Sequence, residues 1–190
     1  MPSLLEETDP FLREICGQPE AVRRAAARFP EARGDLEAIR ERAADVRTIV
    51  FTGMGSSYDA CYPAVNDLAG RGVPALLVDS AELLHFRRPI LGPDALVVVV
   101  SQSGESAEIV RLASEIGKQR EHPFVVSVTN GTGNDLARSA DARLDTAAGP
   151  ESGPSTLTFS AAMTTLSGIA RLLAGDSVET AIDRTRTAAE

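Results

Sequence analysis

Three serines and a glutamine stand close together at residues 101–106, in the run Ser-Gln-Ser-Gly-Glu-Ser. These uncharged side chains donate hydrogen bonds, which suits the oxygens of a phosphate or a sugar. Four valines precede the run and a helical pattern follows it, so backbone N–H groups at the helix start would face the same anion. The run therefore predicts a phosphate site that needs no basic side chain. Its candidate ligands are Ser101, Gln102, Ser103 and Ser106.

A helix cap is the alternative interpretation of this run. Serine is a preferred N-cap residue, so Ser103 could be the cap, with Ser106 in the first helical turn. Three hydroxyls and Gln102 are more than one cap needs. The excess favours a ligand site.

A second polar turn, Gly-Met-Gly-Ser-Ser-Tyr at residues 53–58, follows another apolar run. Its glycines let the backbone approach a ligand closely. A dinucleotide-binding turn needs a third glycine where Tyr58 stands, and a P-loop needs a lysine that this turn lacks. Ser56 and Ser57 are therefore predicted to contact a sugar or phosphate oxygen. A tight turn with a helix cap is again the alternative.

Short apolar runs alternate with helical patterns along the chain and position both turns. The four valines at residues 97–100 are apolar on both faces, as in a buried strand of a parallel sheet. Strands are predicted at residues 48–53, 74–79, 95–101, 124–129 and 142–146, and helices at 58–68, 105–119, 134–139, 155–174 and 177–189. The alternation is typical of an α/β fold, a doubly wound five-stranded parallel sheet flanked by helices. Both turns then lie at the carboxyl edge of the sheet, where such folds bind ligands.

Helical arms are expected at both ends of this sheet domain. A helix is predicted to begin at Asp9 and Pro10, to end at Pro19 where a second helix starts, and a third is predicted at residues 35–46. The expected organisation is an N-terminal helical arm at residues 1–47, an α/β domain at 48–175 and a C-terminal helix at 176–190.

Composition excludes several classes of partner. Of the 190 residues, 27 are acidic and 19 basic, for a net charge of −8, which argues against nucleic acid and anionic membranes as partners. No apolar run approaches the ~18 residues of a membrane span, and no secretory signal pattern is evident. Two cysteines make no disulfide framework, and they lack metal-ligand spacing with the two histidines. We expect a cytoplasmic protein without metal or cofactor.

Four motifs, in chain order, resemble those of the SIS (sugar isomerase) domain. The similarity is closest to the first half of the isomerase part of glucosamine-6-phosphate synthase and to related sugar-amine deglycases. A Met-x-x-Glu-Ile-x-x-Gln-Pro motif is matched at residues 11–19, and Gly-x-Gly-Thr-Ser-Tyr-x-Ala is matched at 53–60, with Ser56 for threonine. Ser-Gln-Ser-Gly-Glu-Thr is matched at 101–106, with Ser106 for threonine. Gly-Pro-Glu-x-Gly-x-x-Ser-Thr-Lys is matched at 149–157, one residue shorter and with Leu157 for lysine.

The resemblance implies that the serines and Gln102 bind the phosphate of a hexose phosphate or amino-sugar phosphate. In such relatives, a second SIS half supplies the glutamate that moves the proton between C1 and C2, the histidine that helps open the ring and a C-terminal lysine. The resemblance therefore implies that this chain is the first SIS half of an aminosugar-phosphate isomerase, aminotransferase or deglycase. It would then act as a homodimer or with a second SIS domain.

Two other functions stay open at this point. One is a module that senses a phosphosugar without turning it over. The other is a stand-alone sugar-phosphate isomerase that acts as a dimer, with Glu151 or His85 in the proton-transfer role. Glu151 lies in a loop that could approach the site, and His85 follows the second strand, near the expected ligand edge. Glu105 is expected to stay ionised and structural.

Overall fold

A five-stranded parallel sheet forms the centre of the protein. The computed structural model describes residues 9–190, so residues 1–8 of the predicted arm lie outside the described part of the chain. The strands are β1 (Thr48–Gly53), β2 (Leu76–Asp79), β3 (Ala95–Val100), β4 (Phe124–Thr129) and β5 (Ala142–Asp145). Their order across the sheet is β2-β1-β3-β4-β5, and every neighbouring pair is parallel. The predicted fold class is confirmed.

Both faces of the sheet are covered by helices, which explains why β3 is apolar throughout. Alternate residues of a strand point to opposite faces, and all six residues of β3 are buried. Leu96, Val98 and Val100 pack into one core on one face, while Val97 and Val99 pack into a second core on the other. A strand with one exposed face would instead alternate apolar with polar residues.

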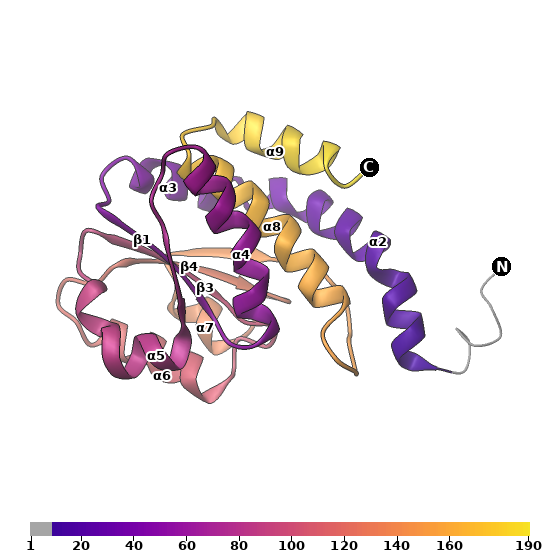
Figure 1. The fold of residues 1–190 in the computed structure, drawn as a ribbon, viewed down its shortest axis with the longest axis horizontal. Coiled ribbons are helices and arrows are strands. Elements are labelled where there is room, and N and C mark those ends of the chain that lie inside the picture. The colour runs from indigo at the N-terminus through magenta and orange to yellow at the C-terminus, as the bar shows by residue number, and fades with distance from the viewer. Residues whose placement is uncertain (1–8) are drawn as a thin grey trace.

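The two helical layers are of unequal size. On one face lie α4 (Ser56–Gly70), α8 (Leu157–Leu173), α3 (Arg33–Ala43) and α9 (Val178–Thr187), and on the other lie α5 (Ser80–Glu82), α6 (Ala107–Gly117) and α7 (Asp135–Ser139). Short helical turns η2 (Leu83–Arg87) and η3 (Arg88–Ile90) follow α5. Figure 1 shows α5, α6 and α7 below the strands and α8 and α9 above them. No helix in the described part of the chain is long and apolar enough to span a membrane.

The N-terminal helix departs from the prediction. A single helix, α2 (Pro10–Arg28), runs through Pro19, which was predicted to end one helix and begin another. A proline inside a helix removes one backbone hydrogen bond and costs ~3 kcal/mol. Pro19 lies on the exposed side of α2, where water can satisfy the carbonyl that loses its partner, while Ala21 and Ala25 pack with Leu157 and Ala161. Tertiary packing therefore overrides the local signal.

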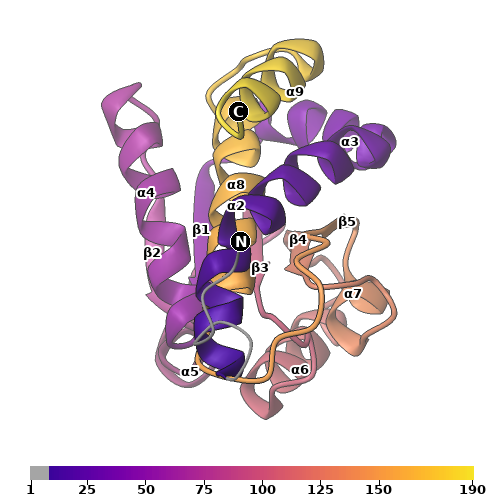
Figure 2. The same cartoon turned by 90° about the vertical axis from the view of Figure 1, so that its right-hand side faces the viewer.

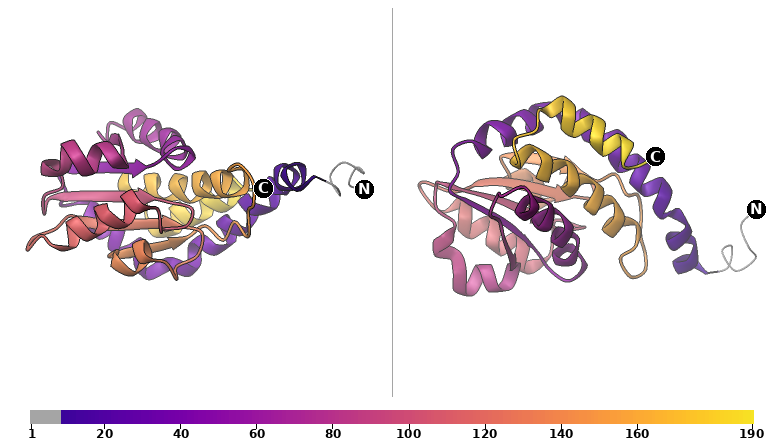
Figure 3. Two further views of the ribbon diagram at one scale, coloured as in Figure 1. Left: turned by 90° about the horizontal axis from the view of Figure 1, so that it is seen from below. Right: turned by 45° about the horizontal axis from the view of Figure 1, so that its top comes forward.

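Two other helices lie close to their predicted positions: α3 was predicted at residues 35–46 and α9 at 177–189. The turn η1 (Phe29–Ala32) joins α2 to α3. The helix α2 runs beside α8 and extends past the strands at its N-terminal end (Figures 2 and 3). Phe29 fits against Gly168 of α8, where a Cβ would lie 2.3 Å from the phenyl ring. The long N-terminal helix is therefore packed on the buried helix that covers the sheet.

Candidate functional site

The carboxyl ends of β1 and β3 form the point where the sheet changes its winding direction. From β1 the chain moves outward to β2, and from β3 it moves the opposite way to β4. Connections that diverge in this way leave a crevice at the carboxyl edge, which is the usual ligand site of open α/β sheets. The turn at 53–58 follows β1 and the run at 101–106 follows β3. The structure therefore brings the two predicted loops to one edge.

A small pocket lies at this edge, between the strand ends and the starts of α4 and α8. It encloses about 280 Å³ of empty space, counting the part open to solvent. Four of the six predicted ligand residues line it: Ser56, Ser57, Ser101 and Gln102.

Ser103 and Ser106, the other two predicted ligands, lie in the same loop but outside the pocket lining, and both are exposed. Ser101 Oγ accepts a hydrogen bond from Gly104 N at 3.1 Å, and Ser103 Oγ accepts one from Glu105 N at 3.2 Å. A hydroxyl that accepts in this way keeps its own proton for another partner. The loop thus orients two O–H donors that an anion can use.

Gly104 gives the loop its shape. Its φ is +66°, a region that residues with a side chain rarely adopt. A Cβ at this position would lie only 2.0 Å from Asn134 Oδ1, because the N-cap residue of α7 packs directly against the loop. Asn134 itself is held, since its Oδ1 accepts from Ala137 N and its Nδ2 donates to Gly131 O. Gly104 is therefore required both for the backbone turn and for this close contact.

The start of α4 meets the end of β1 with similarly little space. A Cβ at Gly53 would lie 2.8 Å from the backbone carbonyl carbon of Ser57. Because Gly53 has no side chain, the first turn of α4 packs directly against the end of β1, which places Ser56 and Ser57 at the pocket. The first glycine of the turn therefore sets how close the two serines come to the neighbouring strand.

Three longer helices, α4, α6 and α8, begin beside the site, and they differ in how their first N–H groups are used. At α8, the Glu151 carboxylate accepts from the backbone N–H groups of Thr156 and Leu157, both at 2.7 Å, and from Thr158 N at 3.3 Å. At α6, the N-cap residue is Ser106, and its side chain makes no capping hydrogen bond. A helix start of this kind attracts anions. The starts of α6 and of α4, whose N-cap Gly55 also makes no side-chain capping bond, therefore have N–H groups that suit an anion.

Glu151 is a capping group in this structure. Its carboxylate also accepts from the hydroxyls of Thr156, at 3.0 Å, and Thr158. Burial raises the pKa of Glu151, but the hydrogen bonds from Thr158 and Thr156 outweigh it and hold that pKa below its usual value. It does not line the pocket, although Thr158 does. A carboxylate so fully engaged is a poor general base.

His85, the other residue considered for proton transfer, lies away from the pocket. The expectation that it would lie near the ligand edge is wrong. It belongs to η2 and borders a separate hollow with Pro93 and Glu121, which precede β3 and β4. The chain turns back after β2, so His85 reaches the opposite, amino edge of the sheet. The position of His85 in the sequence, shortly after the end of β2, does not reveal that the chain turns back toward the amino edge.

The wall of the pocket beside β4 and β5 was not predicted from the sequence. Its polar residues are Thr129, Asn130, Thr146 and Thr158, and Ser155 and Phe159 complete this side. Thr129 ends β4 and Thr146 follows β5 directly. The rule that placed a site after β1 and β3 applies equally to β4 and β5. That rule, applied to all five strands, was the signal that could have found these residues.

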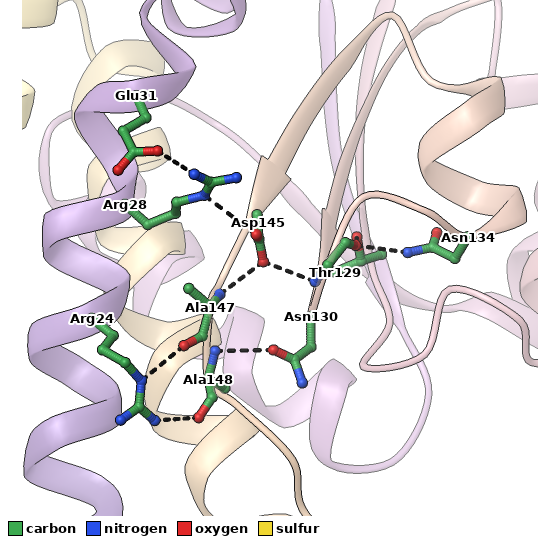
Figure 4. A network of polar contacts seen from close by, with 10 residues as sticks. Arg24, Arg28, Glu31, Thr129, Asn130, Asn134, Asp145, Ala147 and Ala148 are labelled. Carbon is green, nitrogen blue, oxygen red and sulfur yellow. Dashed lines mark hydrogen bonds and ion pairs between the residues drawn. The ribbon is translucent and has the colours of Figure 1, made fainter.

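A polar network fixes this wall in place (Figure 4). Asp145 Oδ1 accepts from Gly131 N and Ala147 N, both at 2.8 Å, and Asp145 Oδ2 pairs with Arg28 Nε at 3.3 Å. Arg28 also pairs with Glu31. These contacts connect α2 and the loops after β4 and β5. The wall is therefore braced from the N-terminal helix.

The same helix holds the loop at residues 149–156. Glu14 is buried, and its Oε1 accepts from Ser152 N at 2.7 Å and from Ser152 Oγ at 2.8 Å. Gln18 Oε1 accepts from Ser160 Oγ at 2.8 Å. Glu14 and Gln18 belong to the first of the four motifs, and Ser152 belongs to the last. The structure thus shows why the motifs occur together: the first one positions the loop that leads into α8.

The chemistry available in the pocket is hydrogen bonding. Among the described residues, none that lines it is an Asp, Glu, His, Lys or Arg. The described residues also contain no cluster of three His, Cys, Asp or Glu side chains that could hold a metal ion. The pocket is therefore suited to binding oxygens, while a proton transfer would need a group from elsewhere.

Comparison with known proteins gives consistent matches. The family model described as the SIS domain matches residues 44–171. The glutamine–fructose-6-phosphate aminotransferase (isomerizing) of Clostridium acetobutylicum is 33% identical over 149 residues, which cover 74% of this chain and 24% of that protein. The enzyme of the same name from Pyrococcus horikoshii is 32% identical over 169 residues, or 86% of this chain and 27% of that protein. The chain thus spans about a quarter of the length of these relatives.

A solved structure shows the same fold. The C-terminal domain of glucosamine-fructose-6-phosphate aminotransferase from Francisella tularensis superposes with a TM-score of 0.72 and 24% identity. The alignment covers 93% of this chain and 52% of that one.

Proposed function

Because the chain belongs to the SIS domain family, we propose that its pocket binds a phosphorylated sugar or amino sugar. The single observation that carries this proposal is the convergence of Ser57, Ser101 and Gln102 on one pocket at the winding switch of the sheet. The curated relatives are named for an aminotransferase that acts on fructose 6-phosphate. That name supports a hexose phosphate as the ligand.

The phosphate is assigned to the loop at 101–106 and the start of α6. Its ligands are Ser101, Gln102, Ser103 and Ser106, with Ser56 and Ser57 on the sugar or the phosphate. A dianion at a helix start gains ~1–2 kcal/mol in favourable geometry, and each hydrogen bond to a charged group adds ~1.5–3 kcal/mol. Several together support micromolar binding, about −8 kcal/mol, after the costs of association.

We further propose that residues 48–175 act as the first SIS half of an aminosugar-phosphate isomerase, aminotransferase or deglycase. Isomerisation requires a base within hydrogen-bond reach of the sugar carbon, and the pocket lining contains no ionisable side chain among the described residues. The base then comes from a second SIS domain or from a partner copy in a homodimer. The same feature favours the second candidate function, a module that senses a phosphosugar without turning it over.

Calorimetric titration with fructose 6-phosphate and glucosamine 6-phosphate tests the binding proposal. The full chain is expected to bind at least one of them, and Ser101→Ala is expected to weaken binding ~10-fold or more, because it removes a buried donor to a charged group. Ser114→Ala, in an exposed position of α6 outside the pocket, is the matched control and keeps wild-type affinity. Absence of binding by folded wild-type protein would refute the proposal.

Turnover separates the two candidate functions. An enzyme half is expected to convert its sugar phosphate in the presence of a second SIS half or a partner copy, whereas a sensing module binds it unchanged. Conversion by this chain alone, abolished by Glu151→Gln, would instead establish the stand-alone isomerase.

A further inference from the structure

The hydroxyl of Thr146 is a buried polar group of the pocket that has no hydrogen-bond partner among the described residues. Thr146 directly follows β5, lines the pocket and is 3% exposed. Its backbone N–H donates to Thr129 O at 2.9 Å, but its Oγ1 is buried with no hydrogen-bond partner among the described residues. Buried hydroxyls nearly always have a partner, so one that lacks it calls for an explanation.

We propose that Thr146 Oγ1 binds a hydroxyl of the sugar's carbon chain and thereby contributes to sugar specificity. The inference rests on the proposed function and assigns a second part of the ligand to the same pocket. The phosphate belongs to the loop after β3, while Thr146 follows β5, two strands away. Adjacent strands lie ~4.8 Å apart, so the separation is ~10 Å. That is too far for one phosphate group to touch both, but it suits the length of a hexose chain.

Neighbouring polar side chains on this wall are already engaged. Thr129 Oγ1 donates to Gly131 O at 2.6 Å. Asn130 uses both ends of its amide, since Oδ1 accepts from Ala148 N at 2.9 Å and Nδ2 donates to Gly149 O at 2.8 Å. Thr158 Oγ1 is hydrogen-bonded to the Glu151 carboxylate and to the Ser155 hydroxyl. Thr146 therefore differs from them: its hydroxyl can both donate to and accept from a ligand at no expense to an existing contact.

The backbone around Thr146 is held on both sides. Asp145, before it, accepts from two backbone N–H groups and pairs with Arg28. Ala147, after it, has a φ of +48° and accepts from Arg24 Nε at 3.1 Å through its carbonyl. Figure 4 shows these contacts anchoring the segment to α2. A group fixed in this way binds without an ordering cost, as preorganised sites do.

Thr146→Val tests the proposal, because valine keeps the shape and removes the hydroxyl. Calorimetric titration of the full chain with fructose 6-phosphate is expected to show ~10-fold weaker binding, while competition by inorganic phosphate is unchanged, since the phosphate loop is intact. Thr146→Ser keeps the hydroxyl and is expected to stay within about threefold of wild type. The ligand-free Thr146→Val protein is expected to melt no lower than wild type, because it loses a hydroxyl that has no partner in the fold.

Thr185→Val is the matched control. Thr185 is equally buried, but on α9 and with its Oγ1 donating to Ala181 O at 2.7 Å. This variant is expected to lose stability and keep wild-type affinity. Thr146→Ala provides a second removal of the hydroxyl if Thr146→Val fails to fold.

Three results would overturn the inference. Unchanged fructose 6-phosphate affinity in the variant without the hydroxyl would exclude the contact. Equal weakening of fructose 6-phosphate and inorganic phosphate would mean a distorted pocket. If wild type binds inorganic phosphate but neither fructose 6-phosphate nor glucosamine 6-phosphate, the proposed function itself fails, and this inference fails with it.

Discussion

Removal of the Glu151 side chain is expected to destabilise the protein, because this carboxylate starts α8. It accepts from three backbone N–H groups and two hydroxyls at the first turn of the helix. The N-cap residue of α8, Thr156, makes no side-chain capping bond of its own. The cap is thus supplied from five residues upstream, and α8 is the helix that α2, α4 and α9 pack against.

The size of the effect follows from these contacts. Loss of a helix cap costs ~0.5–2 kcal/mol, and a hydrogen bond to a charged group contributes ~1.5–3 kcal/mol. Because Glu151 is partly exposed, water can replace some of these bonds. We expect Glu151→Ala to lower the free energy of unfolding by ~2–4 kcal/mol and Glu151→Gln, which keeps an acceptor oxygen, by ~1 kcal/mol. Urea denaturation at pH 7 measures both, with the exposed Glu121→Ala as a near-neutral control.

The lowered pKa of Glu151 also predicts a pH dependence. The folded state holds this group's proton less tightly than the unfolded state does, because hydrogen bonds favour the carboxylate. Its contribution to stability is therefore present above the unfolded pKa of ~4.3 and is lost as the pH falls through the lower folded pKa. Wild type is expected to lose more stability than Glu151→Gln on acidification below about pH 5.

Two results would refute this reasoning. An unfolding free energy of Glu151→Ala within ~0.5 kcal/mol of wild type, the range of ordinary surface substitutions, would show that the carboxylate is not a functioning cap. A Glu151→Gln protein of wild-type stability that loses an isomerase activity of this chain would identify Glu151 as a base instead.

Two further substitutions test the elements that shape the site. Gly104→Ala is expected to destabilise the fold by ~2–4 kcal/mol in urea denaturation and to abolish hexose phosphate binding in calorimetric titration. The reason is that it forces a side chain into the left-handed region and against Asn134. Gly117→Ala is the control: a Cβ there has no neighbour within 4 Å, so this variant should be neutral or stabilising in the same two assays. Glu14→Ala is expected to cost ~1–3 kcal/mol and weaken binding moderately, since Ser152 loses two hydrogen bonds. Exposed Glu20→Ala on the same helix is its control, and equal behaviour of the two variants would contradict a positioning role for Glu14.

The loops at the site illustrate how far sequence reasoning reached. Ser56, Ser57, Ser101 and Gln102 could be placed together in advance, because parallel strands bring their carboxyl ends to one edge. Thr146 has no such local signal beyond its place after a strand. What distinguishes it is the state of its neighbours: the side chains of Thr129 and Asn130 are hydrogen-bonded within the fold, and Thr146 Oγ1 is not. The partner of a hydroxyl cannot be read from the residue that carries it.

Local composition by itself determined the alternation of strands and helices, the covered parallel sheet, the two serine-rich loops and the family resemblance. Each of these depends on residues adjacent in the chain or on a fixed period. The tertiary structure alone decided that α2 runs through Pro19, that His85 faces the opposite edge, that Glu151 caps α8, and that Glu14 holds Ser152 across 138 residues of sequence. Those outcomes depend on which distant groups meet, and pairing energy between distant groups leaves no periodic pattern in a single chain.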